Sequence, residues 1–229
     1  MGCFIIKYYF LYLLSRMFLG NPIAALVLVF IVYAIVDRKF IGFLPDFFKP
    51  LRRWRKISAL KMEIESRPSL GRAYYELGAL QVEGGNMQEG RSNLEIAHTL
   101  MPEHPDLEYY LGVARIRTGD LDMGKEILEG ALKLNSKLKY AFPYVYLIEC
   151  TLKKGEAWEK IDAYMEKIRE YGNPEIFYEL GTIFLQEGQK EQAREMFNEA
   201  QTTLKDCPSF MRKQYRNYVI KAKIKNLLM

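Results

Sequence analysis

The chain has 229 residues, 49% of them hydrophobic and 27% charged, with a formal net charge of +5. This length suits one medium-sized domain with an appendage; the charged fraction excludes a wholly membrane-embedded protein, and the apolar fraction argues against disorder. The net charge is +2 over residues 1–48, +6 over 49–72, −9 over 73–206 and +6 over 207–229. An acidic body therefore lies between two basic ends.

An apolar segment near the N-terminus predicts a membrane anchor within residues 1–48. The uncharged run Pro22–Val36 gives a helix of only about 22 Å, against a hydrocarbon core of roughly 30 Å, but a start at Met17 gives twenty residues. Gly20-Asn21-Pro22 interrupts this longer helix. The anchor is therefore either one span from about Met17 to Val36 or a short helical hairpin with the triplet at its tip. The apolar residues 8–14 slightly favour the hairpin, and a buried core helix is the alternative without a membrane.

Basic and aromatic residues follow the apolar segment and continue into a predicted basic neck helix over residues 49–70. By the positive-inside rule, this flank lies in the cytoplasm. The sequence thus predicts an integral protein of the cell membrane whose remaining, C-terminal part is cytoplasmic. Contacts with the membrane surface are expected from Arg38, Lys39, Lys49, Arg52, Arg53, Trp54, Arg55 and Lys56.

A leucine–glycine pair recurs through the rest of the chain. Leu77-Gly78 is followed 34 residues later by Leu111-Gly112, and Leu180-Gly181 has the same sparse pattern of small and large residues around it. This pattern resembles the tetratricopeptide repeat, a helix–turn–helix unit of 34 residues. The resemblance implies an all-α fold: a tetratricopeptide-like helical solenoid over residues 71–207, behind the N-terminal transmembrane segment. Three clear units lie at 71–104, 105–138 and 174–207, and a degenerate one lies at 139–173.

The degenerate unit and the chain end complete the predicted domain order. Ile148 stands where the other units have a glycine, and Lys160 and Lys167 replace small residues, so this unit is either a divergent repeat or a helical spacer. Residues 208–229 are predicted to form a basic helix with an apolar stripe. Such a helix suits the end of a repeat stack, which needs a cap, and contact with a membrane or nucleic acid is the alternative use of its basic face.

The sequence shows no grouping of residues for catalysis. His98 and His104 are the only histidines, no cysteine lies near them, and the spacing of a metal site is absent. The three cysteines are odd in number and far apart, which indicates no disulfide framework and favours a reducing compartment. We therefore expect that the protein is not an enzyme and that it has no catalytic residue, no metal site and no cofactor.

A groove for a partner protein is the main functional expectation. In the family that the chain resembles, the first helix of each unit lines a concave groove. Transferring these positions to the chain gives an aromatic and aliphatic groove with scattered charge; the alternative is that the same side chains pack against the next repeat. The predicted groove residues are Arg72, Tyr75, Val82, Asp106, Tyr109, Ile116, Arg117, Phe142, Lys153, Tyr178 and Leu185.

The resemblance and the N-terminal segment together predict a membrane-tethered scaffold or adaptor that binds a protein partner in the cytoplasm. The partner would be a protein or peptide segment with apolar anchors, and membrane lipids would contact the N-terminus. One alternative is a structural or assembly subunit of a membrane complex that acts through the N-terminal hairpin. Another is a nucleic-acid or ribosome-proximal binder that uses the basic ends, which the charge of −9 on the body disfavours. No small-molecule substrate is expected.

Overall fold

The computed structural model describes residues 12–13, 23–24, 27–29, 31 and 49–229. Helices connected by short turns fill residues 49–229, and no β-strand occurs in the described part. The helices are α3 (Lys49–Ser66), α4 (Gly71–Glu83), α5 (Met87–Leu100), α6 (Pro105–Arg117), α7 (Leu121–Leu134), α8 (Phe142–Lys154), α9 (Trp158–Tyr171), α10 (Pro174–Gln186), α11 (Lys190–Asp206) and α12 (Ser209–Leu228). The prediction of an all-helical solenoid is confirmed.

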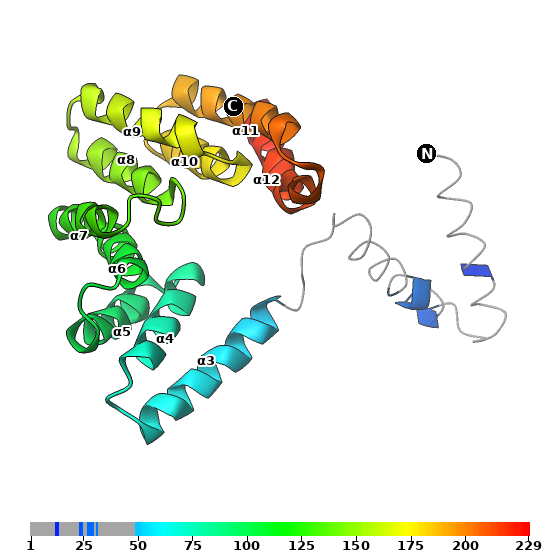
Figure 1. Cartoon of the computed structure of the whole chain (residues 1–229). Coiled ribbons are helices and arrows are strands. Elements are labelled where there is room, and N and C mark those ends of the chain that lie inside the picture. The colour runs from blue at the N-terminus through cyan, green and yellow to red at the C-terminus, as the bar shows by residue number, and fades with distance from the viewer. Residues whose placement is uncertain (1–11, 14–22, 25–26, 30, 32–48) are drawn as a thin grey trace.

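Antiparallel helix pairs follow one another along an open arc (Figure 1). The first helix of each pair, α4, α6, α8 or α10, lies on the inner side of the arc, and its partner α5, α7, α9 or α11 lies on the outer side. At one end, α3 packs against α4; at the other, α12 packs against both α10 and α11. The molecule therefore offers a concave face built from the first helices and a convex face built from the second helices.

Glycines set the close approach of the helices within three of the pairs. A Cβ atom added to Gly78 would lie 2.6 Å from Leu94 Cγ, and one added to Gly112 would lie 2.7 Å from Leu128 Cγ. At Gly181 the same atom would lie 2.7 Å from the Phe197 ring. Only a residue without a side chain lets the two backbones approach this closely.

The large residues opposite these glycines fill the core of each pair. Leu94, Leu128 and Phe197 are fully buried. The turns between paired helices contain glycines with positive φ, at 89° for Gly85, 95° for Gly119, 63° for Gly155 and 78° for Gly188. Glycine adopts this left-handed conformation without the steric cost that a Cβ atom imposes, and so each pair can reverse direction tightly.

The α8–α9 pair has a looser crossing than the other pairs. Ile148 occupies the glycine position and is fully buried, so its side chain stands between the helices. Before α8, Lys139 and Tyr140 have φ values of 46° and 58°, which non-glycine residues rarely adopt. These two residues lie in the turn that joins the second pair to the third, where the sequence interval between equivalent positions is two residues longer than between the first two units.

The prediction of an integral membrane protein is wrong, because no helix in the described part of the chain is both long enough and apolar enough to cross a bilayer. The two longest helices there, α3 and α12, are rich in lysine and arginine. The single-span and hairpin alternatives rest on residues 1–48, which lie outside the described residues except at 12–13, 23–24, 27–29 and 31.

Candidate functional site

The concave face carries the predicted groove residues, but several of them are core residues. Val82, Tyr109 and Ile116 are exposed by only 5%, 7% and 1%. Val82 and Ile116 pack against the glycines of their own second helices: a Cβ at Gly90 would lie 2.7 Å from Val82, and one at Gly124 would lie 2.7 Å from Ile116. The structure therefore shows that Val82 and Ile116 pack within the solenoid.

The other predicted groove residues keep part or all of their side chains accessible. Arg72, Arg117 and Lys153 are exposed, whereas Tyr75, Asp106, Phe142, Tyr178 and Leu185 are half-buried. They do not form one cluster: Arg72 pairs with Glu76 on its own helix at 2.8 Å, and Asp106 pairs with Lys139 at 3.0 Å. The accessible surface of the concave face is thus mainly polar and aromatic, with few aliphatic groups.

A row of tyrosines runs along the concave face across α4, α6 and α8. The ring centroids of Tyr75 and Tyr110 lie 6.3 Å apart, those of Tyr110 and Tyr109 5.1 Å, and those of Tyr109 and Tyr146 6.1 Å. The Tyr110 hydroxyl donates a hydrogen bond of 2.7 Å to Glu83. Burial raises the pKa of Tyr75 and of Tyr146 to about 12, so both stay neutral in the physiological range.

Tyr110 and Tyr146 were not among the predicted groove residues. Tyr110 directly follows the predicted groove residue Tyr109, and Tyr146 directly follows Val145; both preceding residues are buried. The signal that could have found them is the repeated aromatic pairing in the sequence, Tyr74-Tyr75, Tyr109-Tyr110 and Tyr144/Tyr146.

A buried carboxylate gathers two predicted groove residues at the middle of the concave face. Glu149 is only 2% exposed, and its carboxylate lies 2.7 Å from Lys153 Nζ and 3.1 Å from an Arg117 Nη atom. The Arg117 guanidinium also stacks over the Tyr146 ring, 5.7 Å from its centroid. A buried anion needs such partners because desolvation alone disfavours its charge. Glu149 thereby holds Arg117 and Lys153 side by side, with part of each cation still facing solvent.

Helix α12 covers the groove positions of the last pair. The Tyr218 ring packs at a tilt against Tyr178 with centroids 5.8 Å apart, and the Tyr218 hydroxyl donates a hydrogen bond to Glu175. Lys225 Nζ donates a 3.0 Å hydrogen bond to Thr182 and lies 5.3 Å from the centre of the Tyr178 ring. The accessible part of the concave face is therefore centred on α6 and α8, and Tyr178 contributes less of it than the sequence suggested.

The predicted membrane-surface residues fall into two groups. Arg38 and Lys39 lie outside the described residues, and so does the side chain of Lys49. On α3, Arg52, Trp54, Arg55 and Lys56 are exposed and Arg53 is half-buried, while Lys56 Nζ lies 3.1 Å from Glu76 of α4. Leu60 of α3 packs against Ala73 and Leu77 of α4. The structure thus places these side chains on a helix that belongs to the solenoid.

Within the described residues, no group of three or more His, Cys, Asp and Glu side chains is placed to hold a metal ion. His104 has a structural role, since its Nδ1 accepts a 3.2 Å hydrogen bond from the Leu107 backbone at the start of α6. The side chains on the concave face can bind by hydrogen bonds, ion pairs and stacking.

The sequence model of the tetratricopeptide repeat matches residues 174–203, which span α10 and most of α11. The α10–α11 unit is a tetratricopeptide repeat, and the chain as a whole has the tetratricopeptide-repeat fold. The helix pairs, the glycine crossings and the matched unit all agree with this assignment. The fold is typical of protein-binding scaffolds that carry no catalytic site. No curated protein sequence matches the chain.

Solved structures share this fold at low sequence identity. The tetratricopeptide-repeat protein TTC0263 from Thermus thermophilus is 19% identical with a TM-score of 0.54, over 76% of this chain and 89% of that one. MamA is 22% identical with a TM-score of 0.50, over 66% and 87% of the two chains. A tetratricopeptide-repeat protein from Parabacteroides merdae is 14% identical with a TM-score of 0.51, over 94% and 85%. At these identities the likeness concerns the fold alone.

Proposed function

We propose that this tetratricopeptide-repeat protein is a scaffold that binds a protein segment along its concave face, with Arg117 and Lys153 as the central charged contacts. The observation that carries the proposal is the buried Glu149, which pairs with both cations, while Arg117 also lies over the Tyr146 ring. Long basic side chains lose conformational entropy on binding, and a buried ion pair removes part of that cost before the partner arrives.

The accessible side chains suggest what the partner segment contains. Tyr75 and Tyr110 offer aromatic surface and hydroxyl groups, and Phe142 and Leu185 are half-buried apolar groups on the same face. A segment with one or two apolar side chains for these positions and an acidic or hydrogen-bond-accepting group for Arg117 fits this surface. Recognition by side chains on a preformed groove is a common way in which helical repeats bind peptides.

Site-specific crosslinking in cells tests which face binds. A photoreactive benzoylphenylalanine is introduced in place of Arg72 or Lys153 on the concave face, or in place of Lys167 on the outer helix α9. We expect both concave positions to capture the same protein and the outer position to miss it. Equal capture from both faces would refute the use of the groove.

The captured protein, once purified, allows a direct test of the two cations. Arg117→Met with Lys153→Met should weaken its binding to the full chain at least tenfold, because two fixed charged contacts are lost while the aliphatic stems remain. The matched control, Lys160→Met with Lys167→Met, changes two exposed lysines of α9 and should leave the dissociation constant unchanged. An unchanged constant in the first variant would contradict the assignment.

A further inference from the structure

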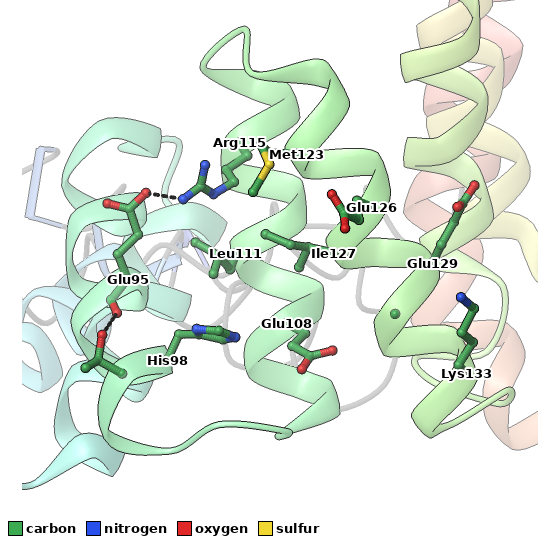
Figure 2. A pocket seen from close by; sticks show the side chains of 12 residues that line it. Glu95, His98, Glu108, Leu111, Arg115, Met123, Glu126, Ile127, Glu129 and Lys133 are labelled. Carbon is green, nitrogen blue, oxygen red and sulfur yellow. Dashed lines mark hydrogen bonds and ion pairs between the residues drawn. The ribbon is translucent and has the colours of Figure 1, made fainter.

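A pocket of about 700 Å³ opens on the convex side of the solenoid, away from the proposed groove. It lies between the outer helices α5 and α7, with α6 at its base. Figure 2 shows Glu95 and His98 on the α5 side, Glu108 and Leu111 on α6, and Ile127 and Lys133 among the residues of α7. The pocket is thus formed by two successive repeats.

The pocket combines an apolar base with carboxylates. Leu111 is only 2% exposed and Ile127 is half-buried, so both offer aliphatic surface. Glu108, Glu126 and Glu129 add three carboxylates to the lining. No cation of the described chain lies within ion-pair distance of these three, although Glu129 accepts a long hydrogen bond of 3.4 Å from Tyr164.

The other charges of the lining do not compensate for these carboxylates. Arg115 is held in a network that closes one end of the pocket: its guanidinium lies 2.8 Å from Glu95 and 2.7 Å from Asp120. Lys133, on the α7 wall, is the only lysine among the residues that line the pocket (Figure 2). Burial also raises the pKa of Glu108, although His98 and His104 act in the opposite direction. A positively charged ligand would complement this site.

Gly130 shapes the α7 wall of the pocket. It lies inside α7, where glycine weakens a helix relative to alanine. Gly112 and Gly124 in the same pair are required by packing, because a Cβ at either would lie 2.7 Å from a core side chain. A Cβ at Gly130 would meet only Glu108 Oε2, at 3.8 Å, which is ordinary contact. Helix packing therefore does not require a glycine at this position, and the missing side chain leaves the α7 wall open towards Glu108.

We propose that the α5–α6–α7 pocket binds a lysine side chain of a partner protein, with its aliphatic stem on Leu111 and Ile127 and its ammonium group at Glu108. Lysine fits because its stem is apolar and its charge is compact, so it can follow the wall at Gly130 to Glu108. Glu126 and Glu129 then face the approaching basic segment. This surface is separate from the concave groove, so one scaffold molecule can hold two partners on opposite faces.

The test uses a nuclear magnetic resonance titration of the full chain with Nα-acetyl-lysine methylamide. The matched probe, Nα-acetyl-norleucine methylamide, has a stem of the same kind without the ammonium group. We expect the lysine probe to shift the backbone amide signals of Gly130, Ile127 and Glu108 in a saturable way, and the norleucine probe to bind at least tenfold more weakly. Equal binding of both probes, or no saturable shift with the lysine probe, would overturn the proposal.

Two variants locate the binding. Glu108→Gln should weaken the lysine probe at least fivefold, with Glu166→Gln on exposed α9 as the control that leaves binding unchanged. Gly130→Ala should weaken binding at least threefold without lowering the melting temperature. The control is Ser92→Ala, at an exposed residue of α5. Unchanged binding in both pocket variants refutes the site. Spermidine serves as a free polyamine, and binding of spermidine a hundredfold tighter than the lysine probe would overturn the assignment to a protein side chain.

Discussion

The second and third helix pairs differ at the point where their helices cross. In α6–α7, Gly112 and Gly124 bring the two backbones together, and Leu128 fills the space beside them. In α8–α9, Ile148 occupies the place of Gly112 and is fully buried in the C-terminal core with Ile161 and Ile168, whereas Lys160 is exposed. The α6–α7 helices pack through close approach of their backbones, whereas the α8–α9 helices pack through large side chains.

This difference shows how one fold accommodates two ways of packing. A glycine crossing allows a single spacing, because any added atom collides with the partner helix. A crossing filled by Ile148 sets a wider spacing. The same region carries Glu149, Lys153 and Tyr146 on the concave face, so the looser pair is also the one that supplies the centre of the proposed groove.

The largest effect is expected when the side chain at the wide crossing is removed. Ile148→Ala should lower the free energy of unfolding by about 2–5 kcal/mol, because a fully buried side chain is lost and the spaced helices cannot close the cavity completely. Urea denaturation of the full chain measures this loss. A loss below about 1 kcal/mol would mean that α8 and α9 can approach as the glycine pairs do, and that Ile148 does not set their spacing.

The narrow crossing is tested by adding a single methyl group. Gly112→Ala places a Cβ 2.7 Å from Leu128 and 3.1 Å from the Gly124 carbonyl oxygen. Overpacking costs about 1–3 kcal/mol, and the better helix propensity of alanine returns up to about 1 kcal/mol, so we expect a net loss of about 1–2 kcal/mol in urea denaturation.

The matched control for this change lies in the same helix pair. Gly130→Ala is the same substitution where the added Cβ has room, and it should leave stability unchanged or raise it by up to about 1 kcal/mol. If the two variants shift the urea midpoint in the same direction, the distinction between packing glycines and the pocket glycine fails.

Much of the fold could be predicted from the sequence because its determinants are local in the chain. The Leu-Gly pairs mark the crossings, and Gly85, Gly119 and Gly188 mark the turns, so the helix pairs follow from spacing alone. Ile148 also signalled the divergent crossing. The spacing of residues in the sequence does not predict how deeply a side chain is buried, because burial depends on how closely the partner helix approaches.

The candidate groove was predicted less well for this reason. Val82 and Ile116 stand at positions that line the groove in the tetratricopeptide-repeat family. Here they pack into the core, because Gly90 and Gly124 of the second helices have no side chain to keep them out. Tyr110 and Tyr146 reach the concave face from neighbouring positions of the same helices. The contacts of α12 with Tyr178 and Thr182 join residues more than 35 positions apart, and no repeat pattern encodes them.

A smaller effect is expected at the start of α10, which has a side-chain cap that α8 lacks. Asn173 Oδ1 accepts hydrogen bonds from the backbone N–H groups of Glu175 and Ile176, at 3.0 and 3.1 Å. Asn173→Ala should therefore cost about 1 kcal/mol of unfolding free energy. Asn86→Ala is the control, since Asn86 precedes α5 without a side-chain capping bond and should cost clearly less. Equal losses would show that the Asn173 bonds do not stabilise the fourth pair.

The smallest effect concerns the ion pairs that join the second and third pairs. Glu156, in the turn of the third pair, lies 2.8 Å from both Lys125 of α7 and Lys160 of α9. Hydrogen bonds from Lys125 and then Lys160 lower the pKa of Glu156 to about 2 from its usual 4.5. A lowered pKa means that the ionised form stabilises the fold, so this contribution is full above pH 4.5 and is lost as the pH falls towards 2.

Glu156→Gln removes that pH-dependent contribution. Because these ion pairs border solvent, the wild-type chain should exceed the variant by at most about 1 kcal/mol of unfolding free energy at pH 6, and this difference should shrink steadily between pH 5 and pH 3. Glu159→Gln changes an exposed carboxylate in the first turn of α9 and serves as the control. A difference between wild type and Glu156→Gln that stays constant over this pH range would show that ionisation of Glu156 does not stabilise the contact between the second and third pairs.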